Sequence, residues 1–240
     1  MNKPAGLVFL ATFGSACLGW AGGKPESGLL FYCGFENGVR AETAVGNPVP
    51  VAEGRADAVE GRTGKGLLTG DGFITKLSYE NKGNFEAKQG TVSLWIKPQD
   101  WLGAEGTAKL FHLFRQGDSL RGYYGLELQR FSTKNPALMF YSLKFPQQGR
   151  VYITDRKSAA WSNGVWRHVA FTWDDKQVNL YTDGALAGSG QLTAPYADSD
   201  ITARHFSFGT KGEEHTVIDN VGIWNRPLSA AEIAALYQGE

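Results

Sequence analysis

Apolar and polar residues alternate with a period of two along residues 165–188. Because successive side chains of a strand point to opposite faces of a sheet, this alternation predicts strands and not helices. A polar triplet at 174–176 separates two alternating runs, and Asp183-Gly184 follows the second run. An Asp-Gly pair favours a type I′ turn, in which both central residues take a positive φ. The segment therefore predicts two successive antiparallel hairpins.

The C-terminal segment, residues 217–237, predicts one strand followed by one short helix. Alternation runs to Trp224 and stops before Pro227, which has no N–H to donate to a strand ladder. Ser229 and Glu232 have the spacing of a capping box. Three apolar residues then recur at helical spacing, as in a helix of about two turns. They are Ile233, Leu236 and Tyr237.

The rest of the chain contains further short alternating runs with Gly, Pro or Asn between them. We expect strands within 29–35, 66–77, 91–97, 109–115, 123–131, 137–144, 150–154 and 205–208. Residues 36–64 are polar and rich in Gly, Pro and Ala, and predict a surface excursion with little regular structure. Short strands at this spacing favour one all-β sandwich over βαβ units.

Four sequence segments together resemble one known family. They are FYCGFENG, GTVSLWIKP, WRHVAFTWDDKQVNLYTDG and IDNVGIWNRPLSAAEIAALY, in this order along the chain. The chain resembles the laminin G-like jelly-roll family, within the concanavalin A-like lectin/glucanase superfamily, over residues 29–238. The resemblance implies an all-β fold, a concanavalin A-like jelly-roll sandwich of two antiparallel sheets with one short C-terminal helix.

The resemblance also implies a function, an exported noncatalytic recognition module that binds a glycan or a cell-surface protein. Two alternatives stay open: a glycoside hydrolase or lyase of the same superfamily, and a structural cell-envelope protein. A retaining glycosidase needs two carboxyl groups about 5–5.5 Å apart. Within this fold that pair usually lies at alternate positions of one strand, and no expected strand has it. We therefore predict no catalytic residue.

Composition excludes other partner classes. The chain has 24 Lys and Arg residues against 24 Asp and Glu residues, so its formal net charge is zero. This balance does not favour electrostatic binding to nucleic acid. Beyond the N-terminus no apolar run is long enough to cross a bilayer. A length of 240 residues suits one large β-sandwich.

The N-terminus reads as an export signal. Residues 1–21 combine a short basic start with an apolar, small-residue stretch, and small residues allow cleavage after Ala21. Residues 22–28 then form a short linker, and 29–238 form the domain. The predicted location is secreted or periplasmic. One alternative is a lipid anchor at Cys17, whose preceding residues partly resemble a lipobox, and another is an uncleaved segment.

Two acidic residues are candidate ligands for one structural Ca²⁺. Members of the family often carry one Ca²⁺ between the N-terminal strand region and the C-terminal strand. Calcium prefers carboxylate and carbonyl oxygens. The resemblance places Asp219 at the family's acidic position, and Glu36 at a position where members often have Asp. The structural alternative for Asp219 is a hydrogen bond that holds the last strand against the first.

Aromatic residues in loop-like segments are the candidates for sugar binding. Sugars stack on exposed rings that have polar groups beside them, and an exposed loop ring without a role is costly. We therefore predict that Trp101, Tyr123 and Trp161 are exposed and bind ligand. Trp173 and Trp224 lie in regular strands and are predicted to be in the core.

Two other groups with chemical potential are predicted to be structural. His168 lies inside an alternating strand and is expected to be buried, with its ring bonded to backbone. Cys33 lies in an apolar run and is expected to be a small buried hydrophobe.

Overall fold

The computed structural model describes residues 25–101, 107–113, 124–131, 138–144, 148–192, 195, 205–211 and 214–239. All structural statements below concern these residues. The expected signal segment, Cys17 and Tyr123 lie outside them.

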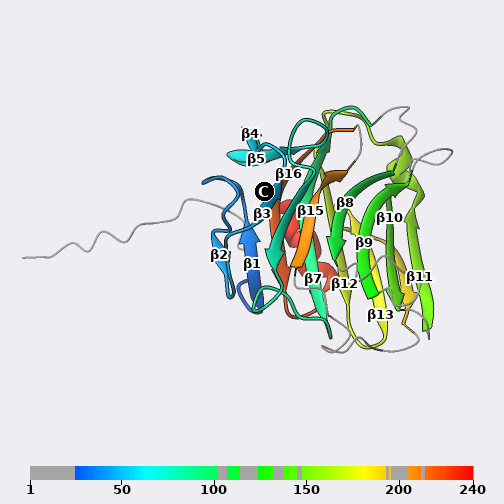
Figure 1. Cartoon of the computed structure of the whole chain (residues 1–240). Coiled ribbons are helices and arrows are strands. Elements are labelled where there is room, and N and C mark those ends of the chain that lie inside the picture. Colours follow the sequence, from blue (N-terminus) through cyan, green and yellow to red (C-terminus); the bar gives the residue numbers. More distant parts are fainter. Residues whose placement is uncertain are drawn as a thin grey trace, which may run out of the picture.

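The fold is a sandwich of two antiparallel sheets (Figure 1). The first sheet has the strand order β14-β13-β12-β7-β16-β1-β2, with β5 paired to β16 and β4 paired to β5. Its strands are β1 (Leu29–Cys33), β2 (Thr43–Ala44), β4 (Asp57–Glu60), β5 (Lys65–Thr69), β7 (Gly90–Pro98), β12 (Arg167–Trp173), β13 (Gln177–Thr182), β14 (Ala185–Gln191) and β16 (Thr216–Trp224). The all-β jelly-roll prediction is confirmed.

The second sheet has the strand order β11-β10-β9-β8-β15-β6-β3. Its strands are β3 (Val51–Glu53), β6 (Lys76–Glu80), β8 (Thr107–Leu113), β9 (Tyr124–Phe131), β10 (Leu138–Lys144), β11 (Gln148–Asp155) and β15 (His205–Lys211). A 3₁₀ helix, η1 (Arg156–Ala160), follows β11, and helix α1 (Ala230–Gln238) follows β16.

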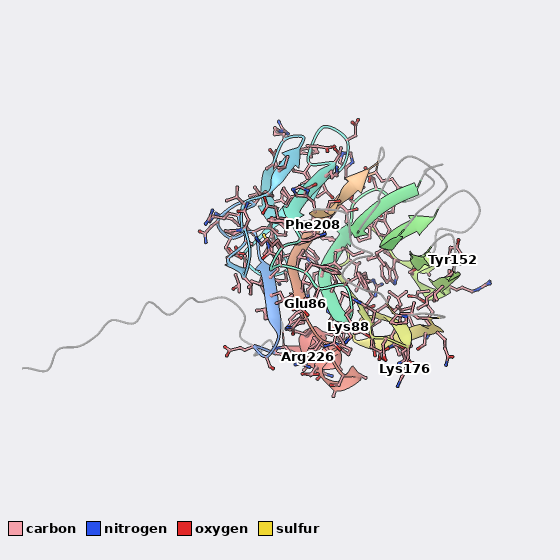
Figure 2. The ribbon with its side chains drawn as sticks, turned by 60° about the horizontal axis from the view of Figure 1, so that its bottom comes forward. Glu86, Lys88, Tyr152, Lys176, Phe208 and Arg226 are labelled. Atoms are coloured by element: carbon pink, nitrogen blue, oxygen red, sulfur yellow. The ribbon has the colours of Figure 1, made fainter. Side chains whose placement is uncertain are left out.

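Strand β11 of the second sheet alternates between the core and solvent, whereas residues 206–210 of β15 are all buried. Phe208 of β15 is 1% exposed, whereas Tyr152 of β11 is 51% exposed. Figure 2 shows Phe208 in the middle of the molecule and Tyr152 at its periphery. Ile153, the next residue after Tyr152, is again buried. This alternation is what an antiparallel sheet with one solvated face requires.

The core between the sheets is built around aromatic rings. Phe31 of β1 meets Tyr79 of β6 edge to face, with 4.7 Å between ring centroids. Trp173, at the end of β12, stacks on Phe85 at 5.3 Å. Its indole N–H also donates to the carbonyl of Ala87 at 2.7 Å. Trp173 is 1% exposed, which confirms its predicted place in the core.

The two expected hairpins are strands β12, β13 and β14 in succession. Asp183 and Gly184 both have positive φ, 48° and 76°, as the predicted turn requires. A Cβ on Gly184 would lie 2.9 Å from the Cβ of Tyr237, on helix α1. This turn therefore needs glycine for its backbone conformation and for its close approach to the helix.

Helix α1 begins with the predicted capping box. Ser229 Oγ accepts the N–H of Glu232 at 3.2 Å, and Glu232 Oε2 accepts the N–H of Ser229 at 2.8 Å. Arg226 donates to both oxygens of the same carboxylate, at 2.6 and 3.1 Å, and Figure 2 shows it beside the helix. These bonds lower the pKa of Glu232 to about 2. The start of the helix is thus tied to the end of β16.

The apolar stripe of α1 covers the outer face of the first sheet. Ile233 and Leu236 are buried against Ala170 and Trp224, in a cluster separate from the core between the sheets. Trp224 is buried as predicted, but it lies under the helix and not between the sheets. Its indole N–H donates to the carbonyl of Pro25 at 2.7 Å, which joins the two ends of the domain.

The segment 36–64 is more regular than the sequence predicts. Strands β2, β3 and β4 lie within it, and β2 and β3 are edge strands of the two sheets. Each has only two to four residues, so their alternation is too short to recognise in the sequence. The expectation of little regular structure holds for most of the segment and fails for these three short strands.

Candidate functional site

Strand β16 changes its pairing partner at Asp219. Before this residue, Thr216 to Ile218 pair with β5, and after it Val221 to Trp224 pair with β1. On the opposite edge the register with β7 is irregular between Asp219 and Gly222. The candidate calcium ligand therefore lies at the junction where the ends of β1 and β5 meet along β16.

Glu36 and Asp219 hold the same turn between β4 and β5. Asp219 Oδ2 accepts the backbone N–H groups of Arg62 and Thr63 at 2.7 and 3.2 Å. Glu36 Oε1 accepts the N–H of Lys65 at 3.1 Å. A Cβ on Gly64 would lie 2.0 Å from the same Glu36 oxygen, so the carboxylate packs directly on the turn. The structure thus brings the two predicted metal residues to one place.

Burial dominates the electrostatics of Asp219. Its side chain is fully buried, and this burial raises its pKa to about 7. The N–H groups that it accepts oppose the shift, whereas the negative charge of Glu36 adds to it. A cation between the two carboxylates would favour the ionised form of both.

Backbone strain gathers beside both carboxylates. Among the described residues, the non-glycine residues with positive φ are Phe35 at 60°, Asp183 at 48° and Asn220 at 50°. Phe35 precedes Glu36 directly, and Asn220 follows Asp219 directly. A bulky residue such as Phe rarely takes this conformation. Such strain clusters at functional sites, which makes this junction a candidate site.

The carboxylates fit Ca²⁺ only if backbone oxygens complete the coordination. The described residues contain no group of three or more His, Cys, Asp or Glu that could hold a metal. Calcium takes six to eight oxygen ligands, so carbonyl groups and water would have to supply the others. The expected bond from the last strand to the first is present, but it comes from Asn220, whose Oδ1 accepts the hydroxyl of Tyr32 at 2.6 Å. Asp219 bonds to the β4–β5 turn instead.

A pocket of about 410 Å³ opens at one edge of the sandwich. Its walls come from the end of β11, helix η1, the start of β12 and the β13–β14 hairpin. The lining residues are Asp155, Lys157, Ala160, Trp161, Arg167, Thr182, Asp183, Ala185, Leu186 and Ala187. This volume lies within the roughly 300–1,000 Å³ of typical small-ligand sites. One predicted ligand residue, Trp161, is thus in a pocket.

Trp161 lines the pocket but is not an exposed ring. It is 9% exposed, and the guanidinium of Arg167 lies 5.4 Å from its ring centroid. The prediction of an exposed loop ring was therefore wrong, because the ring packs against the core and under a cation. A ligand can therefore contact Trp161 only where it forms part of the pocket wall.

Trp101 lies outside this pocket and is also buried. It is 5% exposed, and its indole N–H donates to Thr216 Oγ1 at 2.9 Å. Its backbone N–H donates to Asn163 Oδ1 at 3.1 Å. The predicted exposure of Trp101 was wrong, because a residue without regular structure can still pack inward once its polar groups find partners.

Two carboxylates face the pocket, and each of their four oxygens accepts a hydrogen bond. Asp155 accepts the N–H of Lys157 at 3.0 Å and the hydroxyl of Thr182 at 3.1 Å. Asp183 accepts the N–H of His168 at 3.1 Å and an Arg167 N–H at 2.9 Å. These bonds hold both groups as acceptors. The pocket is thus built to position polar groups, which suits recognition.

Arg167 contacts both the Trp161 ring and the Asp183 carboxylate in the pocket. The guanidinium lies over Trp161 and forms an ion pair with Asp183. Its Nε is buried without a hydrogen-bond partner. Sequence reasoning missed Arg167, Asp155 and Asp183 as site residues. The alternation of β12 signals only a strand, and the approach of η1 to the β13–β14 hairpin is a tertiary contact.

His168 lies next to the pocket but does not enter it. Its side chain is fully buried, and burial lowers its pKa to about 3. Its Nε2 lies 2.8 Å from the hydroxyl of Ser93, and its Nδ1 has no partner. The predicted burial is confirmed, whereas the predicted bond to backbone was wrong. Trp95 and Tyr237 cover the ring on the helix side, at 5.3 and 6.2 Å.

Cys33 is a buried structural residue, as expected. It is fully buried, and its Sγ lies 3.6 Å from the hydroxyl of Tyr79. Burial raises the pKa of the thiol to about 12, so the thiolate that a reactive cysteine needs is absent at neutral pH.

Solved structures that are similar to this chain include receptor-binding domains and one domain of an arabinanase. The receptor-binding domain of botulinum neurotoxin mosaic serotype C/D has a TM-score of 0.70 and 18% identity, over 91% of this chain and 52% of that one. Domain 4 of AbnA, an extracellular arabinanase from Geobacillus stearothermophilus, solved with arabinotriose, has a TM-score of 0.67 and 21% identity, over 89% of this chain and 100% of that one.

A third structure is the binding domain of botulinum neurotoxin DC with rat synaptotagmin II, at a TM-score of 0.65 and 17% identity. The match covers 88% of this chain and 51% of that one. The chain thus spans about half the length of the neurotoxin domains that it matches. At these identities the likeness shows the fold alone. Among the described residues, no helix is long and apolar enough to span a membrane.

No curated protein matches the chain. A family match is present, however, and it covers residues 68–234, more than half of the chain. The match includes β7, β12, β13, β16 and the start of α1, whereas FYCGFENG, the first of the four segments of the resemblance, precedes it. The chain therefore belongs to the laminin G-like family of the concanavalin A-like lectin/glucanases superfamily.

Proposed function

We propose that this protein is an exported, noncatalytic carbohydrate-binding module whose ligand enters the Trp161 pocket. The observation that carries the proposal is the composition of that pocket. An indole ring and small apolar side chains form part of the wall, and Arg167, Thr182 and two carboxylates form the rest. A sugar presents apolar C–H faces beside hydroxyl groups that both donate and accept, so it matches such a mixed lining.

The balanced charges of the pocket lining favour a neutral sugar over a charged one as the ligand. The lining has two cationic side chains, Lys157 and Arg167, and two anionic ones, Asp155 and Asp183. Arg167 is already paired with Asp183. The arabinotriose bound to domain 4 of AbnA supports this class of ligand, and arabinotriose is therefore the first probe. Export through residues 1–21 belongs to the same proposal, with a lipid anchor at Cys17 as its alternative.

A bulky side chain at the rim of the pocket is expected to weaken glycan binding without unfolding the protein. Leu186 lines the pocket and is 56% exposed, so Leu186→Trp adds a ring at the rim at a stability cost within about 0.5 kcal/mol. We expect binding at least about tenfold weaker, a loss of about 1.4 kcal/mol. The measurement is a glycan array that includes arabinotriose, followed by calorimetry on the glycans that bind.

Val165→Trp is the matched control, because Val165 is 43% exposed and does not line the pocket. It should bind as the wild type does. If Leu186→Trp binds glycan as strongly as the wild type, the binding site lies outside this pocket. The proposal that the protein binds carbohydrate would then still hold. A wild-type array that is blank with and without Ca²⁺ would refute the carbohydrate proposal itself.

A hydrolase of the same superfamily remains the alternative function. The pocket does hold two carboxylates, but both accept hydrogen bonds from neighbours, and neither is placed as a proton donor. A retaining hydrolase needs one carboxylic acid and one free carboxylate. Release of reducing sugar from a glycan that binds the array would favour the hydrolase.

We propose further that one structural Ca²⁺ binds between Glu36 and Asp219. Two carboxylates that accept hydrogen bonds from one turn support this site, and one of them is fully buried. The strained backbone beside each carboxylate supports it too. The ion would tie β16 to the β4–β5 turn and to the end of β1. It would act on stability and take no part in ligand chemistry.

Calcium is expected to raise the melting temperature of the wild type and not that of Glu36→Gln. At one hundred times its Kd, a ligand of the folded state alone adds about 2.7 kcal/mol to the free energy of unfolding. Differential scanning calorimetry with Ca²⁺ or with EDTA measures this. Glu60→Gln is the control, because Glu60 is exposed and lies on the same hairpin. A wild-type melting temperature unchanged by EDTA would eliminate the calcium site.

A further inference from the structure

His215 joins three segments at the other end of β16. Its backbone N–H donates to Asp100 Oδ1 at 2.6 Å, and its carbonyl accepts the N–H of Gln99 at 3.0 Å. Its ring reaches the Asp71–Phe73 turn, between β5 and β6. The ring meets Phe73 edge to face at 5.7 Å. His215 is therefore a contact between the start of β16, the segment after β7 and this turn.

Both ring nitrogens of His215 face oxygen atoms that only accept. Nδ1 lies 2.7 Å from the Asp100 carboxylate, and Nε2 lies 2.9 Å from the carbonyl oxygen of Asp71. A neutral imidazole carries one N–H, so it can satisfy one of these two contacts. An imidazolium carries two and satisfies both. The geometry therefore requires the protonated ring for the complete set of bonds.

We propose that His215 is a pH-dependent latch, which holds the Asp71–Phe73 turn on β16 when protonated and releases it when neutral. The release is selective. The Asp100 carboxylate is the stronger acceptor, so the neutral ring keeps its proton on Nδ1 and loses the bond from Nε2 to Asp71. The segment after β7 stays in place through the backbone bonds of His215.

The charges around His215 determine the pH at which the latch opens. Asp100 faces the ring directly, Asp71 contributes its negative charge from the turn, and Glu214 precedes His215 in the chain. Arg55 lies beyond, with its guanidinium 4.9 Å from the ring centroid of Phe73. Hydrogen bonding to Asp100 raises the pKa of His215, while partial burial opposes the shift. The latch therefore opens above the ordinary pKa of histidine.

The backbone at Gly70, directly before the turn, packs closely on His215. A Cβ on Gly70 would lie 2.4 Å from the carbonyl oxygen of Glu214 and 2.8 Å from the His215 ring. Inside the turn, the Phe73 N–H donates to the carbonyl of Gly70 at 3.1 Å. This amide is a direct reporter of the latch, because releasing the turn exposes it to exchange.

Amide hydrogen exchange of Phe73, followed by NMR from pH 5 to pH 9 and corrected for intrinsic rates, tests the latch. We expect its protection to fall roughly fivefold to tenfold through the titration of His215, the effect of one hydrogen bond. The Gln99 amide bonds to the backbone of His215 and should show no step. In His215→Gln the Phe73 amide should have low protection at every pH. His205→Gln replaces an exposed histidine and should keep the wild-type step.

Two results would overturn the proposal: constant Phe73 protection across this range in the wild type, or a step that persists in His215→Gln. Nitrogen chemical shifts of the His215 ring give a second test that needs no variant. They should show both nitrogens protonated below the step and Nδ1–H alone above it. A neutral ring at pH 5, or a neutral ring with its proton on Nε2, contradicts the latch.

Discussion

Trp173→Ala is expected to lower the free energy of unfolding by about 4 kcal/mol, within the range for removing a fully buried aromatic ring. The ring is 1% exposed and stacks on Phe85 at 5.3 Å. The substitution leaves a cavity between the sheets, and it leaves the carbonyl of Ala87 without its donor. Urea denaturation followed by circular dichroism measures the loss.

Trp173→Phe separates the two contributions, because it keeps a ring and removes the indole N–H. Trp166→Ala is the control, since Trp166 is half-buried and the Lys97 ammonium lies over its ring, 4.9 Å from the centroid. We expect this control to cost less than about 1 kcal/mol. A similar small loss for Trp173→Ala would contradict its place in the core.

Two buried groups are expected to give opposite pH dependences that cancel in the wild type. His168 has a pKa of about 3 in the folded protein and 6.5 as its ordinary value. Between these values the unfolded chain binds more protons, so this contribution to stability is complete above pH 6.5 and is lost as the pH falls. Each pH unit inside the window costs about 1.4 kcal/mol.

Asp219 acts in the opposite direction. Its pKa is about 7 in the folded protein and 3.8 as its ordinary value. Between these values the folded protein binds more protons, so this contribution is complete at low pH and is lost as the pH rises to 7. From about pH 4 to pH 6.5 the two slopes nearly cancel.

Single variants should reveal each slope. Stability of Asp219→Asn should fall with falling pH, and stability of His168→Gln should fall with rising pH, each by about 3 kcal/mol over this range. Urea denaturation at a series of pH values measures both slopes. Saturating Ca²⁺ at the proposed site should make the wild type resemble Asp219→Asn, because a bound cation would keep the carboxylate ionised. Identical slopes in the wild type and both variants would contradict the buried, perturbed state of these groups.

The elements that repeat a local pattern could be predicted from the sequence. Alternation over seven to nine residues identifies β7, β12 and β16, and Asp183-Gly184 identifies the hairpin turn. The capping box of Ser229 and Glu232 marks the start of α1. These signals are local, because backbone geometry and neighbouring side chains determine them. Strands of two to four residues carry too little pattern to be predicted.

Exposure of the tryptophans could not be predicted in the same way. Trp101 and Trp161 have no regular structure, yet both are buried, because exposure depends on which distant segments pack on a ring. Thr216 accepts from one indole, and Arg167 covers the other. Glu36 and Asp219 were brought to attention by resemblance, and their common turn appears only in the fold.

The binding of a glycan in the Trp161 pocket is tested most directly by the response of the tryptophan indoles to that glycan. The chain has 7 tryptophans, and indole N–H resonances in an ¹⁵N-labelled sample can be assigned with single Trp→Phe variants. On titration with arabinotriose, or with the strongest ligand on the array, the Trp161 resonance should shift, while those of Trp101 and Trp173 stay in place. A saturable shift of other indoles, with Trp161 unchanged, would contradict the pocket as the binding site.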